Sequence, residues 1–552
     1  MMIKKIVCLL LALGMVLSLA ACGAGPDTGS TPNVSGAPDT ATPTDAASTD
    51  TTAEQIRIET FIVGTTSEIT TANRSEYNFD VISGTISQLA PVRLDENGDY
   101  QPLLCDYSTQ DSKIWVFTIR DGMTWHDGTP VTAGDIEFTL KYLDAQKGGG
   151  YAELYSDIRV TSDTTVELEL PEPNPRHLAT LTTLRIFPKH VYAGIEDYTT
   201  VTNELANIGC GPYRYERFDT ASGVVEFSAF DGYPDGQPAA DTVILKLFDN
   251  EDTMYMSLKA EEIDMIYKYS GGVGAAVVDD LQASGNLTLM PISNTANSAV
   301  FIFNNNAVPG NDINIRKAIA CAIDYDKFRE LFGSEYAVES TAGFIPQGTY
   351  GYVETQTLTR DLEKAGQYLA EAGCSDTNGD GYVEYDGEKL SIVIMLRDDK
   401  PDHARYAELM LNNLAEIGIE IVLDVREVAA FRELTEQQRA QTAVITGLTA
   451  YGMGMNQGLA SLYLWGENAM SYGQVYDEAY KALLDRAAAA AGMDEYKAIA
   501  ADIQNYYAET IPAVALFWDA HIQAFNNRYS GFSVDGTFGI LNVQTWATLS
   551  AN

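Results

Sequence analysis

Between residues 115 and 140, apolar and polar positions follow patterns that predict a strand, a turn and a helix in that order. The first part alternates as a half-buried strand does, with apolar residues on one face: Trp115, Phe117 and Ile119. Two Asp-Gly turn signals, at 121–122 and 127–128, enclose a short second strand at 123–126. Thr132 occupies an N-cap position, with Asp135 three residues later as in a capping box. The pattern predicts a β-hairpin that leads into a helix.

Similar alternation predicts further strands at 56–63, 165–170 and 299–303, and a helical pattern covers 251–263. The first of these strands runs into a small polar loop that begins at Gly64. In open α/β sheets, loops at the carboxyl ends of strands line the ligand crevice. We therefore expect ligand contacts from three residues of this loop: Thr65, Thr66 and Ser67.

The first 22 residues have the pattern of an export signal. Two lysines precede an apolar run at 6–19, which is shorter than the roughly 20 residues that a membrane-spanning helix needs. The end, Leu-Ala-Ala-Cys, resembles a lipoprotein lipobox, so we expect a lipid such as palmitate on Cys22 and anchoring to the outer face of the cell membrane. The alternative is an ordinary secretory signal with an incidental cysteine. Small and polar residues at 23–54 predict a disordered tether with a reach on the order of 30 Å.

The acidic balance of the chain limits its partners. A net charge of -42 disfavours nucleic acid and anionic membrane surfaces, which both require basic patches. About 500 residues follow the tether, enough for two or three domains. Four widely spaced cysteines follow the lipobox, and we expect them to be buried free thiols: Cys105, Cys210, Cys321 and Cys374.

The sequence contains no pattern that is typical of a catalytic site. The five histidines are scattered, and none has the spacing of a metal-ligand pair. Neither a nucleophile elbow nor a phosphate-binding loop is present. We therefore expect no catalytic residue and no cofactor, and we interpret His126 and Asp127 as structural.

Residues 376–382 match part of a calcium-binding pattern. Asp376, Asn378 and Asp380 occupy positions 1, 3 and 5, and a glycine occupies position 6. Position 12 would be Gly387, where a calcium loop needs a bidentate glutamate. Alternating residues at 382–385 and 390–396 indicate flanking strands. We interpret the segment as a tight hairpin, with bound calcium as the alternative.

The run from Trp115 to Phe138 also carries a family resemblance. It reads Trp-x-Phe-x-x-Arg-Asp-Gly-x-x-(aromatic)-His-Asp-Gly-x-Pro-x-Thr-Ala-x-Asp-(aliphatic)-x-Phe. This resembles the signature of the family 5 extracellular solute-binding proteins, the peptide-binding lipoproteins of ABC importers, in which the motif is structural. Further segments resemble the same family in order: 209–215, 314–324, 360–373, 417–423 and 510–517. They imply helices at 314–324 and 360–373 and strands at 417–423 and 510–517.

The resemblance implies an α/β, two-lobe fold like that of periplasmic binding proteins, with an additional small β-rich domain in the first lobe. The expected division begins with the signal at 1–21 and the lipidated cysteine and tether at 22–54. Lobe 1 is expected at 55–90, 206–298 and 517–552, the small domain at 91–205 and lobe 2 at 299–516.

In peptide-binding relatives, an acidic residue of the second lobe pairs with the N-terminal amine of the ligand. The corresponding stretch here is 447–456, where Tyr451 stands at the acidic position and no proline follows. A glycine-rich loop of this kind is compatible with an apolar or sugar-like ligand, although its methionines could equally fill the core. By position, we expect ligand contacts from Asn294, Asn297, Tyr451, Met453, Asn456, Trp465 and Trp518.

The resemblance therefore implies a monomeric extracytoplasmic protein that captures a ligand between two lobes and delivers it to the transmembrane subunits of an ABC permease. The ligand is expected to be a peptide, with an oligosaccharide, a metal chelate or another small solute as the alternative. A secreted hydrolase that uses two carboxylates is the alternative from another class. No carboxylate pair stands out from the acidic background of the sequence.

Overall fold

The computed structural model describes residues 57–552, apart from 97–98, 175, 269–271, 348–350, 452–463, 469–470 and 491–492. The predicted signal, Cys22 and the tether lie outside this part of the chain. No helix among the described residues is long and apolar enough to cross a membrane.

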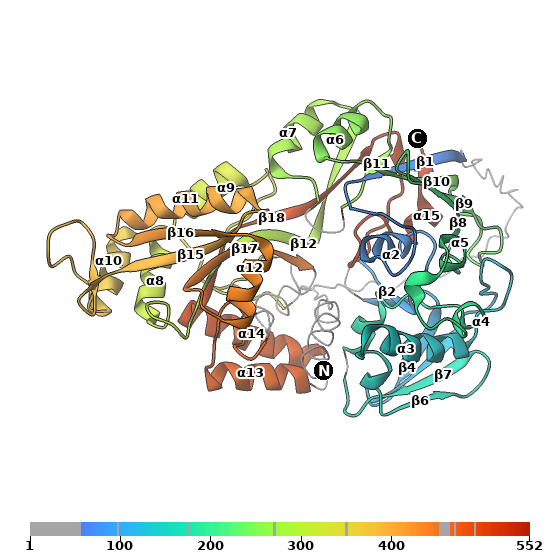
Figure 1. The fold of residues 1–552 in the computed structure, drawn as a ribbon, viewed down its shortest axis with the longest axis horizontal. Helices are drawn as coiled ribbons and strands as arrows, with labels where there is room; N and C mark the ends of the chain where they lie inside the picture. Colours follow the sequence, from blue (N-terminus) through green and yellow to red (C-terminus); the bar gives the residue numbers. More distant parts are fainter. Residues whose placement is uncertain are drawn as a thin grey trace, which may run out of the picture.

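A ten-stranded sheet runs through both lobes of the molecule (Figure 1). Its order is β16-β15-β17-β12-β18-β11-β1-β10-β9-β8. The two central strands, β12 (Leu287–Phe303) and β18 (Ala513–Asn526), are antiparallel and cross from one lobe to the other. Their register shifts twice, between Ile292 and Ala296 and between Ala299 and Val300. The predicted α/β fold with two lobes is confirmed.

Lobe 1 contains the half of the sheet that begins at β11. Its strands are β11 (Met265–Ile266), β1 (Ile58–Thr65), β10 (Ala240–Leu247), β9 (Val224–Ala229) and β8 (Tyr213–Asp219). Phe61 and Val63 of β1 pack on the side of α2 (Tyr77–Ser83), whereas Ile62 packs on the side of α6 (Glu251–Lys259) and α7 (Ala275–Ala283). Helices therefore cover both faces, as a strand with apolar residues on both sides requires.

Lobe 2 contains the other half of the sheet, with the strands β17 (Ala443–Tyr451), β15 (Ser391–Arg397) and β16 (Glu420–Arg426). Phe301 and Phe303 of β12 lie in one core, and Val300 and Ile302 lie in another. The first core includes α8 (Ile313–Ala322), α9 (Tyr325–Phe332), α10 (Leu362–Glu371) and α11 (Pro401–Ala415). The second includes α12 (Val428–Arg432), α13 (Glu478–Ala489) and α14 (Met493–Thr510).

The additional β-rich domain is a four-stranded antiparallel sheet with one long helix packed on it (lower right in Figure 1). The strands, in sheet order, are β4 (Cys105–Thr109), β5 (Ile114–Ile119), β7 (Thr165–Glu169) and β6 (Asp157–Val160). The helix is α3 (Ala133–Lys147). A short hairpin, β2 (Val92–Leu94) with β3 (Tyr100–Pro102), precedes the domain. The predicted capping pair is confirmed, because the Asp135 carboxylate accepts the Thr132 N–H at 2.8 Å.

The predicted second strand at 123–126 is wrong. Within this segment only Thr124 forms a bridge, with Pro130. The N–H of Gly128 donates to the carbonyl of Trp125, and the N–H of Trp125 donates to the carbonyl of Thr129, each at 2.8 Å. These bonds close a tight turn, because the two Asp-Gly signals leave too few residues between them for a paired strand.

Several predicted boundaries also differ from the structure. The strand expected at 299–303 is the end of β12, and polar residues between 293 and 298 hide the rest of that strand from the apolar pattern. The helix expected at 251–263 ends at Lys259, and the chain reverses at Glu261 with φ of 59°. The predicted lobe boundaries at 298/299 and 516/517 fall inside β12 and β18 and stay predictions. All four cysteines after the lipobox are free, as predicted, although Cys321 is only half-buried.

His126 joins two segments that carry the family resemblance. Its Nδ1 accepts the N–H of Gly209 at 3.2 Å, and its Nε2 lies 3.0 Å from the carbonyl of Gly211, to which the neutral Nε2–H tautomer donates. Burial lowers the pKa of His126 to about 4, which keeps the ring neutral. The ring thus holds the small domain to the point where the chain re-enters lobe 1.

We expect the substitution His126→Gln to weaken the pH dependence of stability. The folded ring stays neutral down to about pH 4, whereas an unfolded histidine takes up a proton near pH 6.5. The unfolded state therefore binds one more proton in this window, and the free energy of unfolding falls by up to about 1.4 kcal/mol per pH unit as the pH decreases. Urea unfolding at several pH values should give a slope below pH 6.5 that is smaller by about this amount in the variant. Above that window the two profiles should be parallel, and equal slopes below it would contradict the assignment.

Candidate functional site

The polar loop after β1 lies at the carboxyl end of a central strand, as predicted. Thr65 is the last residue of β1 and is fully buried, whereas Thr66 and Ser67 are half-buried. The Oγ1 of Thr65 accepts the N–H of Ser67 at 3.1 Å and donates to the Oγ of Ser67 at 3.2 Å. The side chains of Thr65 and Ser67 therefore hold the turn in place.

Strand pairing brings three further predicted residues close together at the junction of the lobes. Asn297 of β12 stands opposite residue 449 of β17 and residue 519 of β18, and Tyr451 stands opposite Thr295. Asn294 lies within the first register shift of β12. For Asn294, Asn297 and Tyr451 the structure describes the backbone alone, and the predicted residues Met453 and Asn456 lie outside the described residues.

The two predicted tryptophans belong to the core of lobe 2. Trp518 is fully buried, and its indole N–H donates to the carbonyl of Phe344 at 3.0 Å. Trp465 is 9% exposed in the same cluster, with its Nε1 3.3 Å from an oxygen of Glu467. Neither ring forms an open wall in this structure, and their contact with ligand stays a prediction.

The residues on either side of Trp518 face a groove of about 700 Å³ on the other side of β18. Phe517 and Asp519 line this groove together with residues of α7, the end of α9 and the start of α11. The Asp519 carboxylate accepts the N–H and the Oγ–H of Ser334 at 2.7 and 2.5 Å, and its burial raises its pKa. Sequence patterns could not identify the groove, because its walls come from segments that are far apart in the chain.

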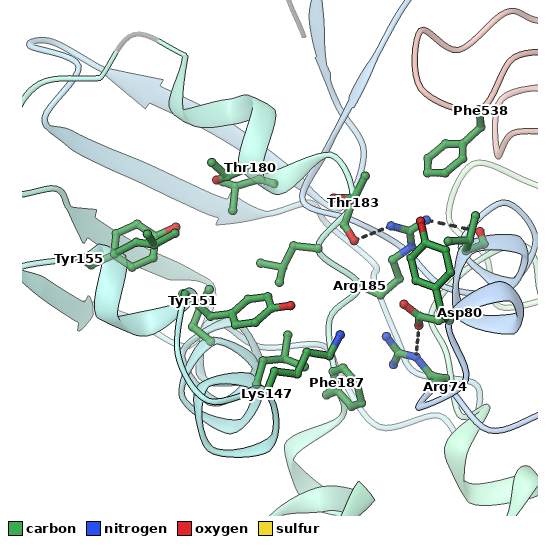
Figure 2. Close-up of a pocket in the computed structure, with 18 residues that line it drawn as sticks. Arg74, Asp80, Lys147, Tyr151, Tyr155, Thr180, Thr183, Arg185, Phe187 and Phe538 are labelled. Carbon is green, nitrogen blue, oxygen red and sulfur yellow. Dashed lines mark hydrogen bonds and ion pairs between the residues drawn. The ribbon is translucent and has the colours of Figure 1, made fainter. Parts of the chain in front are cut away.

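A smaller pocket, of about 90 Å³, lies between lobe 1 and the small domain (Figure 2). Its walls come from α2, the end of α3 and the segments 150–155 and 180–187. Four charged side chains line it: Arg74, Asp80, Lys147 and Arg185. The Nε of Arg74 pairs with a carboxylate oxygen of Asp80 at 3.3 Å. Sequence analysis missed this pocket, since its charged residues are scattered over more than 100 positions of the chain.

The small domain contacts lobe 2 directly through Arg176. Its guanidinium donates to the carbonyl of Ala487 near the end of α13 at 3.1 Å. The same guanidinium lies 4.3 Å from the centre of the Tyr496 ring on α14. A helix C-terminus and an aromatic face are both favourable neighbours for a cation. Arg176 therefore links the two sides of the inter-lobe space.

The segment 376–382, predicted to be a tight hairpin, is a loop closed by a single antiparallel bridge between Ser375 and Glu384. The paired strands β13 (Glu384–Tyr385) and β14 (Glu388–Lys389) follow it and turn at residues 386–387. Carboxylate oxygens of Asp376, Asp380 and Glu384 lie within 4.8 Å of one another. Asp376 accepts the N–H groups of Gly379 and Gly381 at 2.6 and 3.0 Å, so the turn uses its carboxylate already. Bound calcium stays an untested alternative.

One protein-family model matches more than half of the chain. The model describes the bacterial extracellular solute-binding proteins, family 5, and it matches residues 99–471. The chain belongs to this family. The resemblance predicted from the motifs is confirmed, and this solute-binding protein acts outside the cytoplasm, as the members of its family do.

Two relatives of this solute-binding protein come from Bacillus subtilis (strain 168). The oligopeptide-binding protein AppA is 24% identical over 459 residues, which cover 78% of this chain and 79% of AppA. The dipeptide-binding protein DppE is 24% identical over 367 residues, which cover 62% of this chain and 65% of DppE.

Solved structures share the fold over almost the whole chain. The substrate-binding protein CtaP from Listeria monocytogenes has a TM-score of 0.75 at 21% identity, with 90% of this chain and 99% of CtaP covered. AppA from Bacillus subtilis, in complex with a nonapeptide, has a TM-score of 0.69 at 20% identity, with 90% and 100% covered. NikZ from Campylobacter jejuni, in complex with Ni(L-His), has a TM-score of 0.70 at 19% identity, with 89% and 99% covered.

We expect the substitution Arg176→Ala to favour the open form of this solute-binding protein. Loss of the contacts with Ala487 and Tyr496 should destabilise the closed form by about 1–2 kcal/mol, a five- to thirtyfold change in the ratio of closed to open molecules. Small-angle X-ray scattering should detect a larger radius of gyration in the variant.

The matched control is Arg159→Ala on β6, because Arg159 pairs with Asp157 and Glu167 within the small domain. This variant should scatter like the wild type. An unchanged radius for Arg176→Ala, or an equal change in both variants, would show that Arg176 does not hold the lobes together.

Proposed function

We propose that this protein captures a peptide between its two lobes and delivers it to the transmembrane subunits of an ABC importer. The observation that carries this proposal is the pair of long strands, β12 and β18, through which the chain crosses between two lobes. Register shifts in such a pair bend the strands locally and supply a hinge. Arg176 supplies a contact between the small domain and lobe 2.

The names of the relatives support a peptide as the ligand. AppA and DppE are described as oligopeptide- and dipeptide-binding, and one AppA structure contains a nonapeptide. The alternative within the same role is a non-peptide solute, because NikZ holds Ni(L-His) and the similar protein AgaA holds agropinic acid. The resemblance implies an acidic residue where this chain has Tyr451, so both ligand classes are tested.

We propose ligand contacts from the loop 65–67, the centre of β12 at Asn294 and Asn297, and the end of β17 at Tyr451 with the residues that follow it. Cys22 is proposed to carry the lipid that anchors a monomer to the outer face of the membrane. The protein is proposed to bind without turnover, with a secreted hydrolase as the alternative class.

Native mass spectrometry of the purified protein tests the ligand class. We expect the native protein to release a mixture of short peptides on denaturation, because the protein would retain whatever filled its cleft during expression. Release of a single non-peptide solute would identify that solute as the ligand and leave the transport role unchanged. Steady product release from added peptides or glycans would contradict binding without turnover.

The substitution Thr66→Trp tests the position of the site. A large ring at the half-buried loop after β1 should obstruct the cleft and weaken peptide binding by at least about tenfold, with an unchanged melting temperature. The control is Ser162→Trp, in an exposed turn of the small domain. Unchanged affinity in Thr66→Trp would place the ligand elsewhere.

A further inference from the structure

The pocket of Figure 2 is positive in a strongly negative protein. Arg74, Lys147 and Arg185 line it together with one carboxylate, Asp80, so that the lining carries a net charge of about +2, whereas the chain as a whole carries -42. A concentration of one sign of charge within a recess with apolar walls attracts ions of the opposite sign. The pocket therefore favours an anion.

Arg74 is the most deeply buried of these charges. Its side chain has no exposed area, its Nη1 donates to the carbonyl of Ile186 at 3.1 Å, and its guanidinium lies 3.9 Å from the centre of the Phe187 ring. Its Nη2 is buried and has no hydrogen-bond partner among the described residues. A buried guanidinium is stabilised by further negative charge, and Asp80 supplies a single contact at 3.3 Å.

Lys147 and Arg185 approach the pocket from opposite walls. Lys147 is the last residue of α3, and Figure 2 shows its amine directed toward the space in front of Arg74 and Asp80. The Nζ lies 5.8 Å from the centre of the Tyr151 ring. Arg185 donates through Nη1 to the carbonyl of Thr183 and through Nη2 to the carbonyl of Val81 at 3.5 Å, and its guanidinium lies 5.0 Å from the centre of the Phe538 ring (Figure 2). Both cations are thus held at the pocket by contacts with main chain and aromatic rings.

The rest of the wall is apolar. Five leucines line the pocket: Leu140, Leu143, Leu154, Leu181 and Leu184. A volume of about 90 Å³ exceeds the roughly 10–15 Å³ that one water needs in the same measure, so several bonded heavy atoms fit. The walls match a monoanion with a short alkyl chain better than a phosphate. The second negative charge of a phosphate would lie near Asp80, and a phosphate has no apolar surface to bury against the leucines.

We propose that this pocket binds a carboxylate that carries a short apolar chain, with Lys147 and Arg185 facing the carboxylate and the leucines enclosing the chain. Such a group has two sources, a free small carboxylic acid or the C-terminal residue of a peptide. The second source rests on the proposed peptide function. The segment that carries Thr180 to Arg185 begins next to Arg176, which contacts lobe 2, so the pocket adjoins the space between the lobes.

Ligand-observed NMR of the purified protein tests the first source. Sodium butyrate should bind, whereas butyramide, butylammonium chloride and inorganic phosphate should bind at least about tenfold more weakly, because they lack the charge, reverse it or lack the alkyl chain. Lys147→Gln should weaken butyrate binding about fivefold to tenfold. The matched control is Lys141→Gln on the same helix, where Lys141 is exposed and pairs with Glu137 at 2.7 Å.

A second variant keeps the test informative if charge removal alters folding. Thr180→Phe fills the pocket from its rim without removing a charge, and it should also abolish butyrate binding. Equal binding of butyrate and butyramide to the wild type, or unchanged butyrate binding in both Lys147→Gln and Thr180→Phe, would overturn the proposal.

Peptides with free and amidated C-termini test the second source. If the peptide supplies the carboxylate, amidation should weaken binding about tenfold in the wild type and have little effect in Lys147→Gln. Butyrate binding without any peptide binding would contradict the peptide function and support the proposed carboxylate site. If neither amidation nor Lys147→Gln changes peptide binding and butyrate does not bind, the proposed carboxylate site is wrong and the peptide function stands.

Discussion

The antiparallel pairing of β12 with β18 is the interaction on which the rest of the structure depends. The strands are 17 and 14 residues long, and their main-chain hydrogen bonds continue the sheet from one lobe into the other. Each half of the sheet is covered by helices on both faces, and three of the hydrophobic cores each lie within one lobe, while the fourth also takes in Leu94 and Ala179 from the side of the small domain. The chain passes between the lobes only in these two strands, and the register shifts at 292–296 and 299–300 interrupt their ladder between the lobes.

The alternation of β18 gives its two faces different tasks. Trp518 fills the core of lobe 2 and bonds to the carbonyl of Phe344, whereas its neighbours Phe517 and Asp519 face the groove beside α7, α9 and α11. Asp519 holds the start of the segment after α9 through Ser334. A strand that crosses between lobes in this way ties a buried core to a surface whose shape must change as the lobes move.

Much of the fold could be predicted from sequence, because local signals agree with one another. The strand at Trp115 and the capping pair at Thr132 and Asp135 both rest on residues close in the chain. The apolar pattern predicts only part of β12, since polar residues at 293–298 interrupt it. The pocket around Arg74 and Lys147 could not be predicted, because only tertiary packing brings its residues together, and the apolar setting of Trp465 and Trp518 likewise depends on distant segments.

The position of β18 has a consequence for the order in which the protein folds. This strand lies in the interior of the sheet, between β12 and β11, yet it is formed by residues 513–526 of a chain of 552. Neither lobe can complete its sheet until almost the entire polypeptide is available, and such high contact order makes folding slow. The small domain, whose sheet and helix lie between residues 105 and 169, needs none of these residues, so the two lobes are the last part of the molecule to be completed.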